Sequence, residues 1–296
     1  MPSLSFMRFF LKLLVFVSSV AIYAQQPRLF EPNLISKGGV FGFTSSPKGN
    51  EAFWVQSNGG RDTLVIMYSQ RIKGKWQSPQ VASFSGKSWK DIDPIFSPDG
   101  KTVLFQSNRP VPNKLPNPGD FDIWAVNKTT TGWSEAYHLG NVINSDASES
   151  FASITNNGHI YFMKENPDGI GTSDLYVSKK INNVYQPPMN LGQPINTRFR
   201  ESNPYISPDE DYIIYFSSDS TGFGEVDLYI SFLTKGQWSN PKNLGKPINS
   251  EVGEFCPFVH QKQRRIYFSR TVQQKNGRRV ENIYSFPFDV RKYKEE

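Results

Sequence analysis

Residues 201–249 read ESNPYISPDEDYIIYFSSDSTGFGEVDLYISFLTKGQWSNPKNLGKPIN, and most of the chain consists of approximate copies of this stretch. The stretch contains four short runs rich in apolar, aromatic and β-branched residues: 204–207, 212–216, 227–232 and, more weakly, 238–244. Turn residues separate these runs, so each is predicted to be a β-strand. Pro241 interrupts the fourth run, and because proline has no backbone N–H this run is predicted to be an edge strand.

The copies align at equivalent strand positions and recur about every 50 residues. The aromatic residue of the second run, for example, recurs as Trp54, Phe105, Phe162, Phe216 and Phe268. Four short strands repeated at this period are typical of a β-propeller, so the sequence predicts an all-β fold with five four-stranded blades. Six blades remain an alternative if one copy is degenerate.

The last copy ends near Val290 without a fourth strand, whereas residues 27–37 resemble the end of a repeat. An open ring would leave strand edges exposed. We therefore expect this N-terminal segment to be the outer strand of the last blade and to close the ring.

Residues 1–24 have the pattern of a secretory signal peptide. Arg8 and Lys12 give the segment a positively charged start, and the run 11–17 is apolar. Ala21-Ile22-Tyr23-Ala24 provides a small-residue cleavage site. A retained membrane anchor is the alternative, but the run is short for a membrane span. We expect a cleaved signal, a single propeller domain over 25–290, a polar tail over 291–296, and a periplasmic or extracellular location.

Charge and cysteine content limit the classes of partner. Loss of Arg8 and Lys12 with the signal lowers the net charge from +6 to +4, a mild excess that argues against a nucleic-acid partner. The single cysteine, Cys256, allows no internal disulfide and is interpreted as a small buried residue. We expect the mature chain to have no transmembrane segment, to be monomeric by itself, and to bind a protein or another cell-envelope component.

The turn motifs also resemble a known repeat. Ser97-Pro98-Asp99-Gly100 followed by the strand at 104–109, and Ser207-Pro208-Asp209 followed by Tyr215-Phe216-Ser217-Ser218, are similar to the TolB-type, WD-repeat-like propeller repeat, the PD repeat. The segment Asn243-Leu244-Gly245-Lys246-Pro247-Ile248-Asn249 is similar to exported propellers common in Bacteroidetes-type bacteria. The resemblance covers about residues 40–290 and implies a periplasmic or surface interaction module.

One acidic residue precedes each later inner strand: Asp91, Glu149, Glu201 and Glu254. Because inner strands surround the central channel, these carboxylates could meet at its mouth and hold calcium or a basic segment of a partner. The competing interpretation is that each acid makes the same local hydrogen bond in its own blade, which their repetition favours. His138, His159 and His260 fall at unrelated repeat positions, so no metal site is predicted from them.

Residues that break the repeat on the same rim are the second set of binding candidates. Trp89 has no counterpart in the other copies, Arg198 and Arg200 precede Glu201, and Arg109 lies in the long loop 108–121. Variable loops on a rigid scaffold often carry binding residues. The competing interpretation is that Trp89 packs under a loop and the arginines pair with nearby acids.

Catalytic motifs such as Gly-x-Ser-x-Gly and His-Glu-x-x-His are absent from the sequence, so no catalytic residue is assigned. The primary prediction is an exported, non-catalytic propeller that binds a protein or cell-envelope ligand through one rim. The alternative is a carbohydrate-active enzyme, a glycoside hydrolase or polysaccharide lyase, with its site at the channel mouth, because a glycosidase needs only two suitably spaced carboxylates. A deep mouth with unpaired carboxylates would favour the enzyme.

Overall fold

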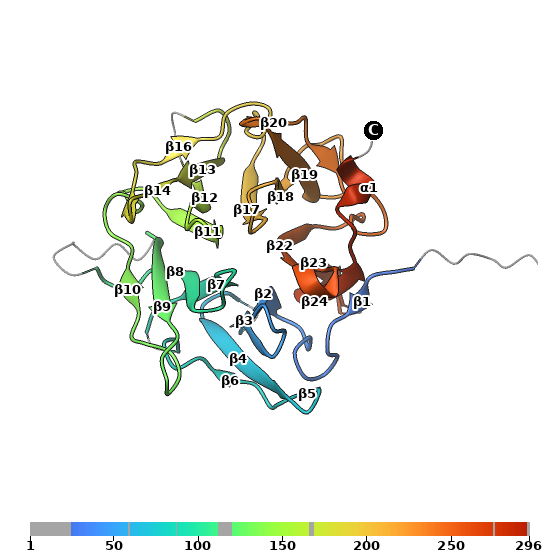
Figure 1. Cartoon of the computed structure of the whole chain (residues 1–296). Helices are drawn as coiled ribbons and strands as arrows, with labels where there is room; N and C mark the ends of the chain where they lie inside the picture. Colours follow the sequence, from blue (N-terminus) through green and yellow to red (C-terminus); the bar gives the residue numbers. More distant parts are fainter. Residues whose placement is uncertain are drawn as a thin grey trace, which may run out of the picture.

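The computed structural model describes residues 25–58, 60–86, 88–111, 120–165, 169–274 and 276–294. Over these ranges the chain forms five antiparallel blades arranged in a ring (Figure 1). The prediction of an all-β propeller with five blades is confirmed. The predicted signal peptide, residues 1–24, lies outside the described residues.

Each blade runs outward from an inner strand at the channel to short strands at the circumference. Blade 1 contains β2 (Val40–Ser45), β3 (Glu51–Ser57), β4 (Leu64–Ile72), β5 (Lys75–Trp76) and β6 (Gln80–Val81). Blade 2 contains β7 (Asp91–Phe96), β8 (Thr102–Ser107), β9 (Asp122–Asn127) and β10 (Tyr137–His138). Blade 3 contains β11 (Glu149–Ile154), β12 (Ile160–Lys164), β13 (Asp174–Ser178) and β16 (Met189–Asn190), with a small hairpin of β14 (Lys180–Ile181) and β15 (Val184–Tyr185).

Blade 4 contains β17 (Glu201–Ile206), β18 (Tyr212–Ser217) and β19 (Asp227–Thr234), with β20 (Gln237–Trp238) and β21 (Lys242–Asn243) both paired to β19. Pro241 lies in the break between these two outer pieces, as expected for a residue without a backbone donor. Blade 5 contains β22 (Glu254–His260), β23 (Arg265–Gln273) and β24 (Arg279–Pro287), and β1 (Arg28–Leu29) is its outer strand. A 3₁₀ turn, η1 (Gln261–Gln263), joins β22 to β23.

The two ends of the chain meet in blade 5, so the predicted closure is confirmed. Arg28 pairs with Ser285 and Leu29 with Tyr284, and β1 lies beside β24 in Figure 1. The contact continues past the strand, because the Ser36 hydroxyl donates to the Ile283 carbonyl at 3.1 Å. Ile35 is fully buried in the core between the first and last blades.

The asparagine that follows the fourth strand in blades 2, 3 and 4 has a structural role. In blade 4 the Asn249 side chain accepts from the Leu228 N–H at 2.9 Å and donates to the Leu228 carbonyl at 2.9 Å. Asn196 makes the same pair of bonds to Leu175 in blade 3, and Asn144 to Ile123 in blade 2. An amide side chain therefore takes the place of a neighbouring strand and fixes the loop to the third strand of its blade.

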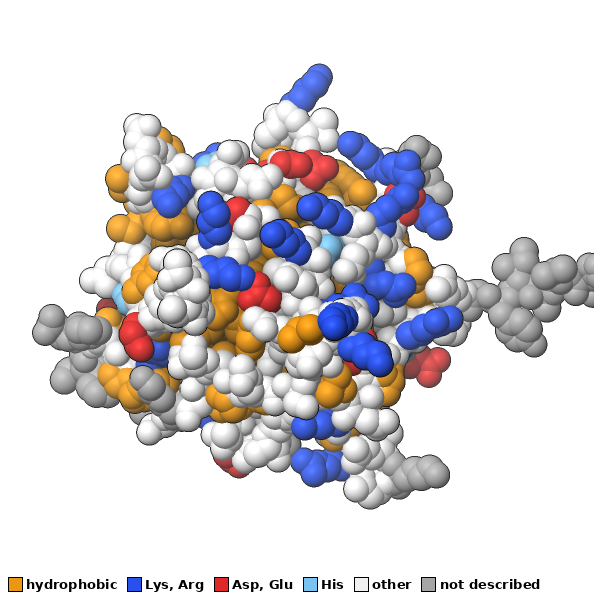
Figure 2. Space-filling model, turned by 60° about the horizontal axis from the view of Figure 1, so that its bottom comes forward, with side chains coloured by type: hydrophobic (Ala, Val, Ile, Leu, Met, Phe, Trp, Pro, Cys, Tyr) orange, Lys and Arg blue, Asp and Glu red, His pale blue; other side chains and the backbone are white. Residues whose placement is uncertain are grey.

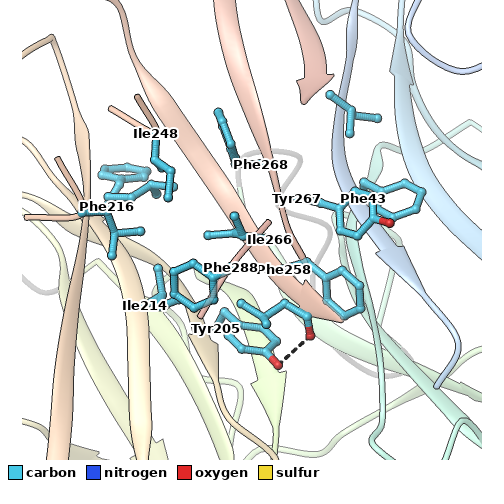
Figure 3. Close-up of a cluster of buried hydrophobic side chains, with 14 of the residues drawn as sticks. Phe43, Tyr205, Ile214, Phe216, Ile248, Phe258, Ile266, Tyr267, Phe268 and Phe288 are labelled. Carbon is cyan, nitrogen blue, oxygen red and sulfur yellow. Dashed lines mark hydrogen bonds between the residues drawn. The ribbon is translucent and has the colours of Figure 1, made fainter. Parts of the chain in front are cut away.

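The core lies between adjacent blades. Its largest cluster joins blades 4, 5 and 1, and Figure 3 shows Tyr205, Phe258, Tyr267 and Phe43 converging from different inner and second strands. Tyr205 donates to the Val259 carbonyl at 2.9 Å and so links blade 4 to blade 5. Packing of this kind fixes the inner strands around the channel.

The C-terminal segment differs from the predicted polar tail. Residues Arg291–Lys294 form a helical turn, α1, in which the Tyr293 ring packs on Phe288 with centroids 5.5 Å apart and the Tyr293 hydroxyl donates to the Leu244 carbonyl. One aromatic residue is enough to dock this short segment against the last two blades. Within the described ranges, no helix is long and apolar enough to cross a membrane.

Candidate functional site

The four acids that precede the inner strands are buried and locally hydrogen-bonded. Glu149, Glu201 and Glu254 each accept from the backbone N–H and the hydroxyl of the residue four positions earlier, which are Ser145, Thr197 and Ser250. Burial raises the pKa of all three glutamates, and these hydrogen bonds oppose the shift. Each carboxylate therefore holds the loop leading into its own inner strand, as the competing interpretation required.

Asp91 plays the same part in blade 2 with different partners. It accepts from the Ser85 hydroxyl at 2.8 Å and the Ser107 hydroxyl at 2.6 Å, and it pairs with Arg109 at 2.6 Å. Among the described residues no group of three His, Cys, Asp or Glu side chains could hold a metal ion. The four acids thus do not form a shared calcium site within the described part of the chain.

The residues that break the repeat differ in how far they are buried. Arg109 is held inside blade 2, where it also donates to the Phe84 carbonyl at 3.1 Å and lies over the Phe105 ring. Trp89 is half-buried. Arg198 and Arg200 are exposed and stack over the rings of Phe199 and Phe216, at 4.9 and 5.2 Å. Residues 112–119 of the long loop lie outside the described residues, and binding by this set stays a prediction.

At one level of the channel every inner strand has a bulge. The bulge residues are Gly42, Asp93, Phe151, Asn203 and Cys256, all with positive φ, and we call this level the waist. The register shift turns these residues toward the axis. The cavity they line has a volume of about 40 Å³, which has room for one or two water molecules and none for a sugar ring.

Polar groups of the waist are tied to one another. The Cys256 thiol donates to Asp93 Oδ1 at 3.3 Å, and Gln106 Nε2 donates to Asp93 Oδ2 at 2.6 Å. Asn203 accepts from the Cys256 N–H at 3.2 Å. Burial raises the pKa of Asp93 to about 7, because the charged form loses its hydration. Sequence reasoning interpreted Cys256 as a small buried residue and did not consider Asp93.

A larger cavity opens beyond the waist, at the end of the channel where the inner strands finish. Its volume is about 430 Å³, and residues from all five blades line it. We call it the mouth cavity. Its aromatic wall is formed by Phe96, Tyr205, Tyr212 and Phe258, and its carboxylates are Asp209 and Asp211. This is the opposite end of the channel from the four buried acids, which begin their strands.

Hydrogen bonds fix the polar groups of the mouth cavity. Asp209 accepts from the Asn156 amide at 2.8 Å, Asp211 accepts from the Ser207 hydroxyl, and Gln261 donates to the hydroxyls of Tyr205 and Tyr212 at 3.0 and 2.7 Å. Both carboxylates nevertheless stay exposed to solvent.

His260 also lines the mouth cavity. Its Nδ1 accepts from the Gln263 N–H at 3.3 Å, and its Nε2 is buried with no hydrogen-bond partner in the described structure. Burial lowers the pKa of His260, so the ring is neutral at pH 7. Sequence reasoning missed this site because its carboxylates, Asp209 and Asp211, lie in a strand-connecting turn, where Pro, Asp and Ser are expected for turn geometry alone.

The mouth cavity continues outward between blades 4 and 5. A second hollow of about 280 Å³ is lined by Arg264, Asp289 and Arg291, and it shares Tyr212, Val259, Gln261 and Val290 with the mouth cavity. We call it the side groove. Together the two form a cleft that runs from the axis of the ring to its C-terminal edge.

A third cavity, of about 490 Å³, lies at the boundary of blades 1 and 2. Its acid, Glu51, accepts from the Tyr68 hydroxyl at 2.9 Å and pairs with Lys128. Its one carboxylate is therefore already paired. Only two of the five blades line it, so it lacks the convergence of residues seen at the mouth.

Comparison with known proteins gives no match to a family model and none to a curated sequence. Solved structures do share the fold. A thermostable family-43 glycoside hydrolase superposes with a TM-score of 0.57 at 13% identity, over 85% of this chain and 91% of the other. An α-L-arabinofuranosidase from Lactobacillus brevis superposes with a TM-score of 0.55 at 12% identity, over 87% and 93%.

These comparisons correct the primary prediction of function. The chain spans 91–93% of three glycoside hydrolases that it matches at TM-scores of 0.55–0.57. It spans 33% of a Mycobacterium tuberculosis puromycin-hydrolyzing peptidase. The prediction of a non-catalytic interaction module was therefore wrong as the first choice, and the carbohydrate-active alternative is the better supported one. At 8–13% identity the likeness to these hydrolases shows the fold alone.

Proposed function

We propose that the protein is a carbohydrate-active enzyme that binds a glycan in the mouth cavity and hydrolyses a glycosidic bond there. The observation that carries this proposal is the mouth cavity itself: about 430 Å³ of space with aromatic walls and two carboxylates at its rim. Its volume is within the range of small-molecule sites, and such sites combine apolar walls with a few polar groups. The glycoside hydrolase neighbours support the proposal by analogy of fold.

Hydrolysis of a glycoside requires two carboxyl groups beside the scissile bond. One protonates the departing oxygen, and the other activates water or attacks the sugar. Asp209 and Asp211 are the carboxyl groups that line the mouth cavity, and Asn156 and Ser207 orient them. Tyr205 and Tyr212, joined through Gln261, provide rigid rings against which a sugar could lie.

The test is turnover of a panel of plant, algal and bacterial polysaccharides by the purified protein. New reducing ends report cleavage, and mass spectrometry of the products distinguishes hydrolysis, which adds water, from elimination, which does not. We expect Asp209→Asn or Asp211→Asn to lower kcat by about 100-fold or more, as loss of a catalytic acid or base does.

Glu251→Gln is the matched control, because the Glu251 side chain is 88% exposed and lines no cavity described above. It should leave turnover unchanged. Circular dichroism would confirm that all three variants are folded. Turnover that survives both aspartate substitutions would remove the mouth cavity as the active site, and failure of the protein to bind or cleave any glycan would overturn the proposed function.

A further inference from the structure

The lining of the mouth cavity divides into a polar part and an apolar part. The lining residues that are exposed to solvent are all polar and lie in the turns that follow inner strands: Asn156, Asp209, Asp211, Gln261 and Lys262. The lining residues that are half-buried are all apolar: Pro47, Ile95, Pro98, Ile154, Pro208 and Val290. We call the second set the apolar collar. Figure 2 shows the same division on the visible surface, where hydrophobic side chains lie in recesses and Lys and Arg side chains project around them.

The apolar collar surrounds the axis of the ring. Its members come from blades 1, 2, 3 and 4 and, as Val290, from the segment that follows blade 5. Its prolines are expected for turn geometry alone, but Ile95 and Ile154 lie in the inner strands β7 and β11. Ile95 also lines the cavity of the waist, so it marks the inner end of the mouth cavity. A ligand group held in the collar is therefore enclosed by apolar side chains on several sides.

The interior of the mouth cavity offers few hydrogen-bonding groups to a ligand. Four buried serines line it. Ser153 accepts from the Ile206 N–H at 2.9 Å, and Ser97 and Ser207 donate to aspartates of their own turns. The fourth, Ser45, contributes a single hydroxyl. A sugar hydroxyl placed against the collar would lose its hydrogen bonds to water and find few replacements, which weakens binding.

We propose that the mouth cavity selects a sugar that carries a methyl group, either the C6 methyl of a 6-deoxy sugar or the methyl of an acetyl group. The methyl lies in the apolar collar, and the ring hydroxyls face the polar turns. This inference rests on the proposed function, because it assumes that the mouth cavity takes a glycan. A fully hydroxylated sugar is apolar only on the faces of its ring, which suits one aromatic wall. A methyl group is apolar in every outward direction and suits a collar.

The experiment compares sugars that differ in one substituent. L-Fucose and L-galactose, like L-rhamnose and L-mannose, differ only in having a methyl or a hydroxymethyl group at C5, and N-acetylglucosamine differs from glucose by its acetamido group. We expect the methyl-bearing sugar of at least one pair to bind at least about tenfold more tightly, because a methyl group in an apolar pocket discriminates by about that factor. Titrations followed by nuclear magnetic resonance measure the affinities, and saturation transfer from the protein should be strongest at the methyl protons.

Ile154→Thr is the test variant, and Ile181→Thr is its matched control. Both isoleucines belong to blade 3, and threonine keeps the β-branched shape that suits a strand. Ile181 is 52% exposed and lines none of the cavities described above. Ile154→Thr puts a hydroxyl into the collar and should reduce the preference for the methyl-bearing sugar by about threefold or more. Ile181→Thr should leave the preference unchanged, and circular dichroism would confirm that both variants are folded.

The possible outcomes separate this inference from the proposed function. A preference in the fucose or rhamnose pair alone identifies a 6-deoxy sugar, and a preference in the acetamido pair alone identifies an acetylated one. Equal binding within every pair, or equal effects of the two variants, would overturn the inference while leaving a glycan site in the mouth cavity. Binding of no sugar in any pair would also overturn it, and the polysaccharide panel then decides the proposed function by itself. Displacement of the sugars by n-hexanol at lower concentration than any of them would make the collar a site for acyl chains instead.

Discussion

Asp93 is a buried carboxyl group whose ionisation lowers the stability of the folded ring. It lies in the waist beside Cys256, Gln106 and the backbone of Gly42, and Arg61 is the nearby cation. Burial raises its pKa to about 7 despite these partners. The carboxyl group is therefore protonated in the folded protein at pH values where it would be ionised in the unfolded chain.

The consequence is a pH-dependent loss of stability. The folded-state pKa is above the unfolded value of about 3.9, so the stability contributed by the bound proton is complete below about pH 4 and is lost as the pH rises to about 7. We expect Asp93→Asn, which does not ionise, to gain stability relative to the wild type between pH 4 and pH 8, by on the order of 4 kcal/mol. Urea unfolding at both pH values measures it.

Asp99→Asn is the control with the opposite sign. Burial raises the pKa of Asp99, but hydrogen bonds from Ser97 and from the backbone of Lys101 outweigh this effect and leave the pKa lowered. This variant should therefore lose stability relative to the wild type as the pH rises through the acid range. The quantity to compare is the difference in free energy of unfolding between each variant and the wild type. If this difference does not change with pH for Asp93→Asn, or changes in the same direction as for Asp99→Asn, the pKa of Asp93 is not elevated.

The residues selected from sequence illustrate what repetition does and does not reveal. Glu149, Glu201 and Glu254 were visible because they recur, yet recurrence reflects the loop-to-strand hydrogen bonds that every blade needs. Asp209 lies in a turn and His260 is the last residue of β22, directly before a turn, and polar residues are expected at both places, so their convergence at the mouth could not be predicted. That convergence depends on the side-chain content of five separate hairpins.

At the scale of single elements, the repeated asparagine explains how such short outer strands stay in place. The outer strands contain only two residues each, which gives few ladder hydrogen bonds. The amide of Asn249 adds two bonds to the third strand and a third to Asn243. The sequence showed the motif, and the structure shows that its Asn replaces part of a missing strand.

Removing this amide should therefore destabilise blade 4. Asn249→Ala leaves the buried N–H of Leu228 without a partner, while the Leu228 carbonyl keeps its bond from the Leu244 N–H, and we expect the free energy of unfolding to fall by about 1–3 kcal/mol. Asn240→Ala, at an exposed position in the break of the outer strand, should cost less than about 0.5 kcal/mol. Equal effects of the two substitutions in urea titrations would show that the amide bonds are dispensable.

The strands were predictable because apolar runs and turn residues alternate in the same order in five copies. A run that is weak in one copy is supported by the equivalent run in the others. The docking of the C-terminal segment could not be predicted, because Tyr293 is its only aromatic residue. Its contacts are with Phe288 and with the Leu244 carbonyl of blade 4. A contact between distant segments has no local sequence signal.

For the whole molecule, the pairing of β1 with β24 joins the first and last blades and closes the ring. The joining segment contributes β1 and the side chains of Phe30, Leu34 and Ile35, which pack into the cluster shared by blades 4, 5 and 1. Burying each such side chain contributes roughly 1.5–3 kcal/mol, so the segment is worth on the order of 5 kcal/mol or more. That is comparable with the entire net stability of many domains.

A variant lacking residues 25–36 should therefore lose the cooperative unfolding of the closed ring. We expect a lower Tm, and separate transitions by tryptophan fluorescence and far-ultraviolet circular dichroism where the full ring gives one. The uncovered edge of β24, nine residues long, should also make the variant aggregate as its concentration rises.

A synthetic peptide of residues 25–37 should restore the Tm in trans and a scrambled peptide should not, because pairing with β24 requires the native register. If the truncated chain instead melted in one transition at the wild-type temperature, the ring would not depend on this closure, and blade 5 would have to be stable with three strands.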